Sequence, residues 1–247
     1  MRLWAVAVWL LAWQLASMVL AAAWPHGRLL LASPLVSLRR LGELAATAAF
    51  WQAVGWSSLR ILGGFLLSCA AAAVLAVPAA RKAWVRELLA PPVAAVKATP
   101  VASFIILALV WLDSRRLPLF IAFLMVFPTV YLNLLEGIRQ TDRKLLEMAR
   151  VFRVPFGRQL RDIYLPQVLP YFRSAASLGL GLCWKAGVAA EVIGLPKGSM
   201  GERLYTAKVY FQTPDLFAWT AAIVAVSAVF ERLFLKLVDL AAGKAAS

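Results

Sequence analysis

Two charged side chains in an apolar run are the first residues whose chemistry could matter. Lys185 lies inside the otherwise uncharged stretch 174–190, and Glu191 follows that stretch directly. Charge at membrane depth is costly and marks functional sites, so Lys185 could face an anion. The alternatives are pairing of Lys185 with Glu191 or with another helix, and extension of its side chain to the membrane surface. Other polar or aromatic residues of the apolar runs that could line such a path are Thr99, Ser103, Asn133, Ser177 and Trp184.

Catalytic chemistry is not predicted for this chain. The sequence contains no G-x4-G-K-S/T phosphate loop, no H-x-x-x-H metal pair and no nucleophile elbow. Its single histidine, His26, cannot make a metal site alone, and Cys69 and Cys183 lie in apolar runs as packing residues do. We therefore expect a protein that is not an enzyme and that binds no metal or cofactor of its own.

A polar stretch at residues 141–170 interrupts the apolar runs. It holds nine Lys, Arg, Asp or Glu residues in its first 22 positions. Arg143, Glu147 and Arg150 recur there at a spacing that allows ion pairs along one helix face. Apolar side chains also recur at helical spacing, at Leu145, Leu146, Met148, Ala149 and Phe152. The pattern predicts a helix outside the bilayer whose apolar face docks against a partner.

The elements that carry these residues are predicted to cross a membrane. Of the 247 residues, 62% are hydrophobic and 15% charged, against about 25% charged residues in soluble domains. The net charge of +14 fits the excess of Lys and Arg in cytoplasmic loops, so binding of nucleic acid is not expected. The predicted fold class is an all-α membrane protein with six transmembrane helices, at residues 3–25, 61–80, 94–112, 117–135, 174–190 and 216–238.

The domain organisation follows from these runs. Residues 1–25 are expected to form an N-terminal transmembrane helix; a cleaved signal peptide is the alternative, although its apolar region is usually about 7–15 residues. Residues 26–60 are expected to form an external amphipathic segment whose helix starts at Ser33-Pro34. Residues 61–240 would then form the core with the other five helices.

Three prolines are expected to shape the third span. Pro91 and Pro92 should interrupt any helix that reaches them, because each removes a backbone donor. Pro100, near the start of the span, predicts a kink.

Orientation follows from the distribution of Lys and Arg. With six spans and the N-terminus inside, the inside segments hold 16 of these residues and the outside segments hold 8. The bias predicts that both termini and the polar stretch 141–170 lie in the cytoplasm.

The polar stretch resembles the EAA loop of bacterial ABC-importer permeases, whose pattern is roughly E-A-A-x3-G-x9-I-x-L-P. Glu147 and Ala149 match its beginning, and Ile163, Leu165 and Pro166 match its end. Met148 replaces the second alanine of the pattern.

Arg153 stands where the family has glycine, and Gly157 comes four residues later. A left-handed arginine would cost on the order of 1 kcal/mol. The turn is therefore expected to be made by residues 154–157 instead.

The resemblance covers about residues 30–240 and is closest to the nitrate/sulfonate/taurine-type subfamily, on runs such as WSSLRILGGFLLS and WKAGVAAEVIG. It implies a MetI-like type I importer permease fold in which residues 141–166 form a cytoplasmic coupling helix that fits a groove of a separate ATPase. The implied coupling residues are Leu145, Glu147, Met148, Ala149, Arg150, Phe152, Arg153, Ile163, Leu165 and Pro166. Glu147 could instead only pair within its helix, and the arginines could be ordinary positive-inside residues.

The resemblance also implies partners. A second copy of the permease, a dimer of ATPase subunits that uses ATP and Mg, and an external substrate-binding protein would assemble in the lipid bilayer of the bacterial plasma membrane. The substrate would be an anion such as nitrate, a sulfonate or taurine, or a vitamin precursor such as a thiamine pyrimidine. The alternatives are an integral membrane enzyme and a secondary transporter without an ATPase, although no inverted repeat is evident.

Overall fold

The computed structural model of the chain describes the backbone of residues 3–246 and the side chains of residues 4–27 and 29–240. Three residues of the Lys and Arg count above lie outside this description: Arg2, and the side chains of Arg28 and Lys244. Within the described backbone every regular element is a helix. In chain order these are α1 (Leu3–Ala23), α2 (Gly27–Leu30), α3 (Pro34–Ala45), α4 (Ala48–Arg81), α5 (Ala83–Ala98), α6 (Val101–Ala108), α7 (Leu117–Arg139), α8 (Arg143–Val151), α9 (Phe156–Gln159), the π-helical turn η1 (Leu160–Tyr164), α10 (Leu165–Gly194), α11 (Met200–Val209) and α12 (Thr213–Ala246).

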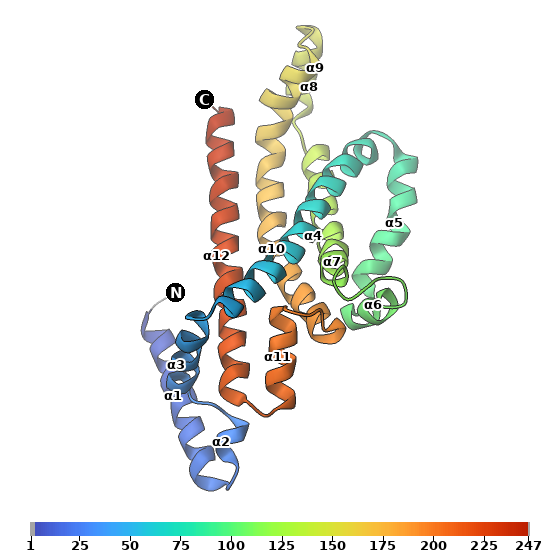
Figure 1. The fold of residues 1–247 in the computed structure, drawn as a ribbon. Helices are drawn as coiled ribbons and strands as arrows, with labels where there is room; N and C mark the ends of the chain where they lie inside the picture. Colours follow the sequence, from blue (N-terminus) through green and yellow to red (C-terminus); the bar gives the residue numbers. More distant parts are fainter. Residues whose placement is uncertain (1–2, 247) are drawn as a thin grey trace.

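Helices α4, α7 and α10 form the centre of an elongated molecule (Figure 1). Phe65 of α4, Val126 of α7 and Leu180 of α10 are buried in one apolar core. The approach of α4 to α7 is closest at Gly64, where an added Cβ would lie 2.3 Å from the carbonyl oxygen of Leu119. Because Gly64 has no Cβ, the backbones of these two helices can approach each other this closely.

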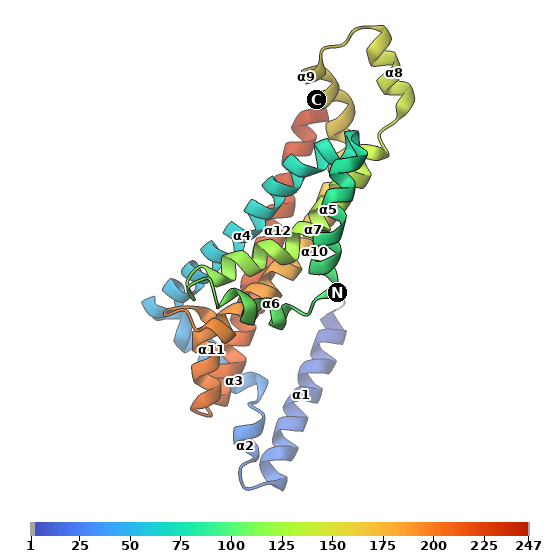
Figure 2. The same ribbon diagram turned by 90° about the vertical axis from the view of Figure 1, so that its right-hand side faces the viewer.

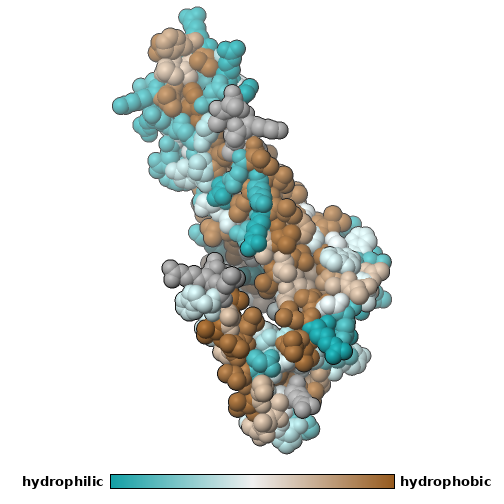
Figure 3. Space-filling view, turned by 90° about the vertical axis from the view of Figure 1, so that its left-hand side faces the viewer, coloured by the Kyte–Doolittle hydropathy of each residue, from teal (hydrophilic) through white to brown (hydrophobic). Residues whose placement is uncertain are grey.

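The remaining helices extend the molecule in two directions. Helices α1, α2 and α3 lie at one end, and α8 and α9 project at the other (Figures 1 and 2). Side chains in the middle are mostly hydrophobic, whereas hydrophilic side chains gather at the α8 end around a few hydrophobic ones (Figure 3). This distribution is that of a protein whose middle lies in lipid and whose projecting end lies in water.

Four helices of the described chain are long and apolar enough to cross a membrane: Trp4–Ala23, Ala48–Arg81, Leu117–Arg139 and Phe156–Gly194. Helices α5 and α6 add a fifth if they are counted as one span, although the chain bends by 105° between them. The sixth predicted span, residues 216–238, lies in α12, which is not among these candidates. The structure thus supports four or five spans directly.

The boundary between the amphipathic segment and the second span lies earlier in the chain than the predicted position between residues 60 and 61. Helix α3 starts as expected, with Pro34 in its first turn and the Ser33 side chain accepting a hydrogen bond from the N–H of Val36 at 3.4 Å. It ends at Ala45, and α4 begins at Ala48 because Thr47 caps it, accepting from the N–H of Phe50 at 3.3 Å. Residues 48–60 therefore extend the membrane helix and do not belong to the amphipathic one.

Of the two predictions about the prolines near the third span, one is wrong and one is confirmed. Helix α5 runs through Pro91 and Pro92 without interruption. Both prolines are exposed, as are residues 87 and 88, whose carbonyl groups lose their helical partners. The missing hydrogen bonds are therefore not buried. Pro100 does break the helix, since α5 ends at Ala98 and α6 begins at Val101.

Candidate functional site

Helix α8 is held at its start by two hydrogen bonds. The Asp142 side chain accepts a hydrogen bond from the N–H of Lys144 at 2.8 Å and so caps the helix. The N–H of Asp142 donates to the side-chain oxygen of Gln167 in α10 at 2.9 Å. The projecting helix is thereby joined to the long helix that enters the centre of the molecule.

One face of α8 presents apolar side chains to solvent. Leu145 is 37% exposed, Met148 47% and Phe152 74%. We call these three residues the docking face. Ala149 was expected to lie with them, but it is fully buried against its own chain. Side chains this apolar, at the most polar end of the molecule (Figure 3), are typical of a surface that another protein covers.

The polar face of α8 lies open. Glu147 and Arg150 are both exposed. Among the described residues no ion pair within 4.0 Å involves Glu147, so the pairing along the helix that the spacing allowed is not formed. The charges of both residues remain available to a partner.

The turn after α8 occurs at Arg153, and the prediction that residues 154–157 would make it instead is wrong. Arg153 has φ of 50°, in the left-handed region. The N–H of Arg153 donates to the carbonyl of Arg150 at 3.1 Å, and that of Val154 donates to the carbonyl of Ala149 at 2.8 Å. These are the two hydrogen bonds of a Schellman motif, whose left-handed position glycine usually occupies. Arg153 thus adopts the left-handed backbone conformation that glycine usually has at this position of the motif.

We expect Arg153→Gly to raise the stability of the protein by about 1 kcal/mol, because the strain of the left-handed arginine is removed. The midpoint of thermal unfolding in detergent measures it. Arg158→Gly is the matched control, since it removes the same charge from an exposed helical position of α9 and should not stabilise. Equal destabilisation by both variants would show that Arg153 is unstrained.

The end of the EAA-like stretch begins the next helix. Ile163 is buried at 8% exposure within η1, whereas Leu165 and Pro166 are exposed and open α10. Pro166 has no N–H to donate, and the N–H of Leu165 donates to the carbonyl of Leu160, five residues back. The fifth helix is thus longer than predicted: a continuous helical run of 39 residues, Phe156–Gly194, contains residues 174–190.

Two of the predicted path residues point into the packed interior of the chain. The Ser177 hydroxyl donates to the Glu231 carboxylate of α12 at 2.8 Å. Trp184 is 3% exposed and lies against Phe230, with ring centroids 5.9 Å apart. Glu231 was not among the residues predicted from the sequence. It could have been chosen, because an acidic residue inside an apolar run is itself a sign of a functional or structural role.

Glu191 forms the most buried polar cluster, which we call the Glu191 cluster. Its carboxylate is fully buried, and Oε2 accepts from the Ser57 hydroxyl at 2.7 Å and from the N–H of Gly201 at 3.1 Å. Oε1 faces Nη1 of Arg60 at 3.7 Å. The Ser57 oxygen in turn accepts from the N–H of Met200 at 2.9 Å. The cluster joins α4, α10 and the start of α11, and Glu191 pairs with Arg60 and not with Lys185.

Lys185 lies instead on an open stripe of α10. Ser174, Leu178, Gly181 and Lys185 are all exposed and follow each other at three- or four-residue spacing. A Cβ added at Gly181 would have no heavy atom within 4 Å. In a single chain nothing covers this stripe among the described residues.

The other predicted path residues make only local contacts. The Thr99 hydroxyl donates to the carbonyl of Ala95 at 2.8 Å. The Asn133 amide donates to the carbonyl of Thr129, also at 2.8 Å. Ser103 is exposed in the first turn of α6. The structure therefore does not gather the seven predicted residues into one site within a single chain.

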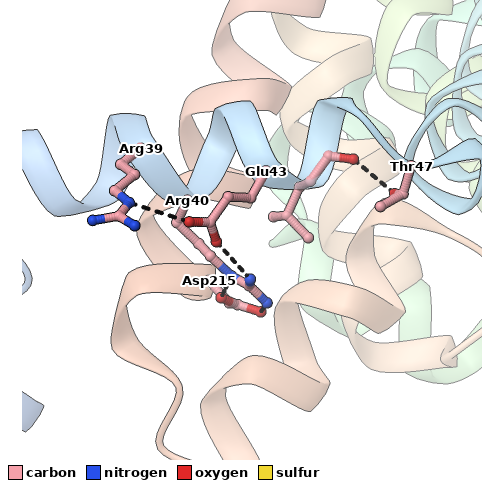
Figure 4. A network of polar contacts seen from close by, with 6 residues as sticks. Arg39, Arg40, Glu43, Thr47 and Asp215 are labelled. Carbon is pink, nitrogen blue, oxygen red and sulfur yellow. Dashed lines mark hydrogen bonds and ion pairs between the residues drawn. The ribbon is translucent and has the colours of Figure 1, made fainter.

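A second polar cluster lies at the opposite end of the molecule from α8 (Figure 4). Arg40 of α3 donates to Glu43 at 3.0 Å and to Asp215 of α12 at 3.1 Å. The hydrogen bonds to Asp215 and Glu43 raise the pKa of Arg40, and the bond from Arg40 lowers the pKa of the Glu43 carboxyl. The Arg40 pair fixes the amphipathic helix to the last long helix.

The long apolar helices define the class: an integral membrane protein. Residues 64–240 match the family described as "Binding-protein-dependent transport system inner membrane component". The chain belongs to this family, and its resemblance to ABC-importer permeases is confirmed.

Named relatives agree with the nitrate/sulfonate-type subfamily. A putative aliphatic sulfonates transport permease of Escherichia coli (strain K12) is 29% identical over 93% of this chain and 83% of its own length. A riboflavin transport system permease of Chloroflexus aurantiacus is 27% identical over 78% of this chain and 72% of its own length. A bicarbonate transport system permease of Synechococcus elongatus is 25% identical over 58% of this chain and 52% of its own length.

Proposed function

We propose that the chain is the pore-forming subunit of an ATP-driven importer with six transmembrane spans and both termini in the cytoplasm of a bacterium. The docking face, whose side chains are exposed, carries the proposal, and it lies on α8, which projects at one end of the molecule (Figure 2). A permease of this family that has no phosphate loop of its own must receive energy from another chain. ATP and Mg would bind to a separate ATPase dimer, and an external binding protein would deliver the substrate.

The coupling role is assigned to the segment 141–166. Leu145, Met148 and Phe152 would enter a groove of the ATPase, with Glu147 and Arg150 contacting its rim. Arg153 sets the turn that follows. Ala149 and Ile163 are buried, so they would position the segment without touching the partner, while Leu165 and Pro166 would lead the motion into α10.

The substrate path is assigned to the open stripe of α10. A second copy that faces this stripe would enclose Lys185 between the two chains and give the path a positive charge. Small anions fit such a path, and two of the relatives above are named for sulfonate and bicarbonate transport. Thr99, Ser103 and Asn133 would lie nearer its walls, whereas Ser177, Trp184 and Glu191 would support it from behind.

The docking face provides the test. Met148→Glu and Phe152→Glu should each lower co-purification of the ATPase by about 100-fold, because a carboxylate would be buried at the interface without a counter-charge. Both side chains are exposed, so the permease itself should fold. Ala149 is a poor choice for this experiment, because a change at a buried position tests folding.

The control is Tyr210→Glu, at a position that is 69% exposed, close to the 74% of Phe152, and far from α8 along the chain. It should leave ATPase binding unchanged. If both docking-face variants retain the ATPase and transport at the wild-type level, the coupling role assigned to this segment is wrong.

A further inference from the structure

An apolar cavity of about 290 Å³ lies where the projecting segment meets the long helices. Helix α4 contributes Ala76 and Ala80 to its wall, α7 contributes Leu134 and Ile138, and α10 contributes Leu165 and Val168. Phe156 and Leu160, just before α10, close the side toward α8. The cavity is near the lower size limit of small-ligand pockets, about 300 Å³.

Arginines surround this apolar space. Arg81 and Arg139 line the cavity itself. A polar hollow shares Ala80 and Arg139 with it and adds Arg143, Glu136 and Gln140. The Gln140 amide donates to one Glu136 carboxylate oxygen at 2.7 Å, and the three arginines outnumber this one carboxylate. In the described part of the chain no ion pair within 4.0 Å involves Arg81, Arg139 or Arg143.

An apolar cavity joined to a mouth with three guanidinium groups is complementary to an anionic amphiphile. Arginine binds phosphate oxygens in a bidentate manner, and basic pockets between membrane helices on the cytoplasmic side bind lipid head groups. Arg81 and Arg139 lie in the last turns of two candidate membrane helices. A lipid phosphate would reach both side chains if these helix ends lie at the membrane surface.

We propose that this groove binds one anionic phospholipid of the cytoplasmic leaflet, with an acyl chain in the cavity and the phosphate between Arg81, Arg139 and Arg143. The side of the membrane rests on the proposed function, which places α8 in the cytoplasm. The lipid would contact α4 and α7 on one side and Phe156 on the other. It would therefore hold the coupling segment in place against the core.

The Arg81 guanidinium already lies over the Phe156 ring, 5.1 Å from its centroid. A guanidinium has five N–H donors, so a cation–π contact with one ring leaves donors for phosphate oxygens. Phe156 is 53% exposed, so a lipid chain could cover it.

The test uses the purified full-length protein in nanodiscs with spin-labelled phosphatidylglycerol or phosphatidylcholine at low mole fraction. The wild type should immobilise phosphatidylglycerol in preference to phosphatidylcholine. Arg81→Gln/Arg139→Gln should reduce this preference by about tenfold or more, since two charge-assisted contacts are lost. Arg158→Gln, which removes an exposed arginine that does not line the groove, should keep it.

A second variant tests the cavity without changing charge. Ala80→Phe fills the apolar space between α4 and α7 and should abolish the immobilised component. The proposal is overturned if the wild type shows no preference, or if both the double arginine variant and Ala80→Phe retain it. The measurement requires no ATP and no ATPase, so its result is separate from that of the docking-face experiment.

Discussion

Replacement of Arg60 by alanine is expected to destabilise the protein by about 3–5 kcal/mol, because it leaves a buried carboxylate without its counter-charge. Glu191 is fully buried, and Arg60 is the cation 3.7 Å from its Oε1. The Ser57 hydroxyl and the N–H of Gly201 satisfy only Oε2. Unfolding of the purified protein in mixed micelles, followed by loss of tryptophan signal, measures the effect.

Two variants make this experiment specific to charge. Arg60→Ala/Glu191→Gln should recover most of the loss, since an amide oxygen still accepts from Ser57 and Gly201 and carries no charge. Arg39→Ala removes an arginine whose side chain is 84% exposed and should cost less than about 1 kcal/mol. Similar losses for Arg60→Ala and Arg39→Ala, without recovery in the double variant, would rule out a buried ion pair in the Glu191 cluster.

Gly64→Val is expected to be the second most damaging change, at about 3 kcal/mol or more. Even the first added carbon would lie 2.3 Å from the Leu119 carbonyl oxygen and 2.9 Å from Cβ of Ala122. A backbone oxygen cannot move as a flexible side chain can, so α4 and α7 would have to separate and lose their packing. The yield of monodisperse protein and its unfolding midpoint measure the change.

The neighbouring glycine is the control. A Cβ at Gly63 would have only the end of the Leu119 side chain nearby, at 3.5 Å, which is an ordinary contact. Gly63→Ala should therefore be tolerated, or slightly stabilising because alanine favours the helix. If Gly63→Ala and Gly64→Val lower the midpoint equally, the damage does not come from the close approach of α4 to α7 at Gly64, and the packing explanation is wrong.

Local signals predicted the helices well. The Ser33-Pro34 start and the kink at Pro100 are present, and the first apolar run forms α1 almost as expected. The apolar spacing from Leu145 to Phe152 predicted an amphipathic helix, and α8 (Arg143–Val151) forms there with Phe152 as its C-cap. These features depend on side chains within a few residues of each other, so the sequence contains the information.

Contacts between distant residues were beyond the sequence patterns. Glu191 and Arg60 lie in different apolar runs, and nothing local indicates which cation approaches which carboxylate. Lys185 was the nearer choice in the sequence and is exposed. The left-handed Arg153 was rejected for its local cost, which the hydrogen bonds of the Schellman motif offset.

The continuous helical run Phe156–Gly194 has a mechanical consequence. Its 39 residues correspond to a rod about 60 Å long. The exposed segment is joined to it near one end, and Glu191 is held three residues from the other. A rod of this length that tilts by about 5° about one end displaces the other by about 5 Å. A tilt of this helix would therefore move the start of the run, next to α8, and the end beside Arg60 together.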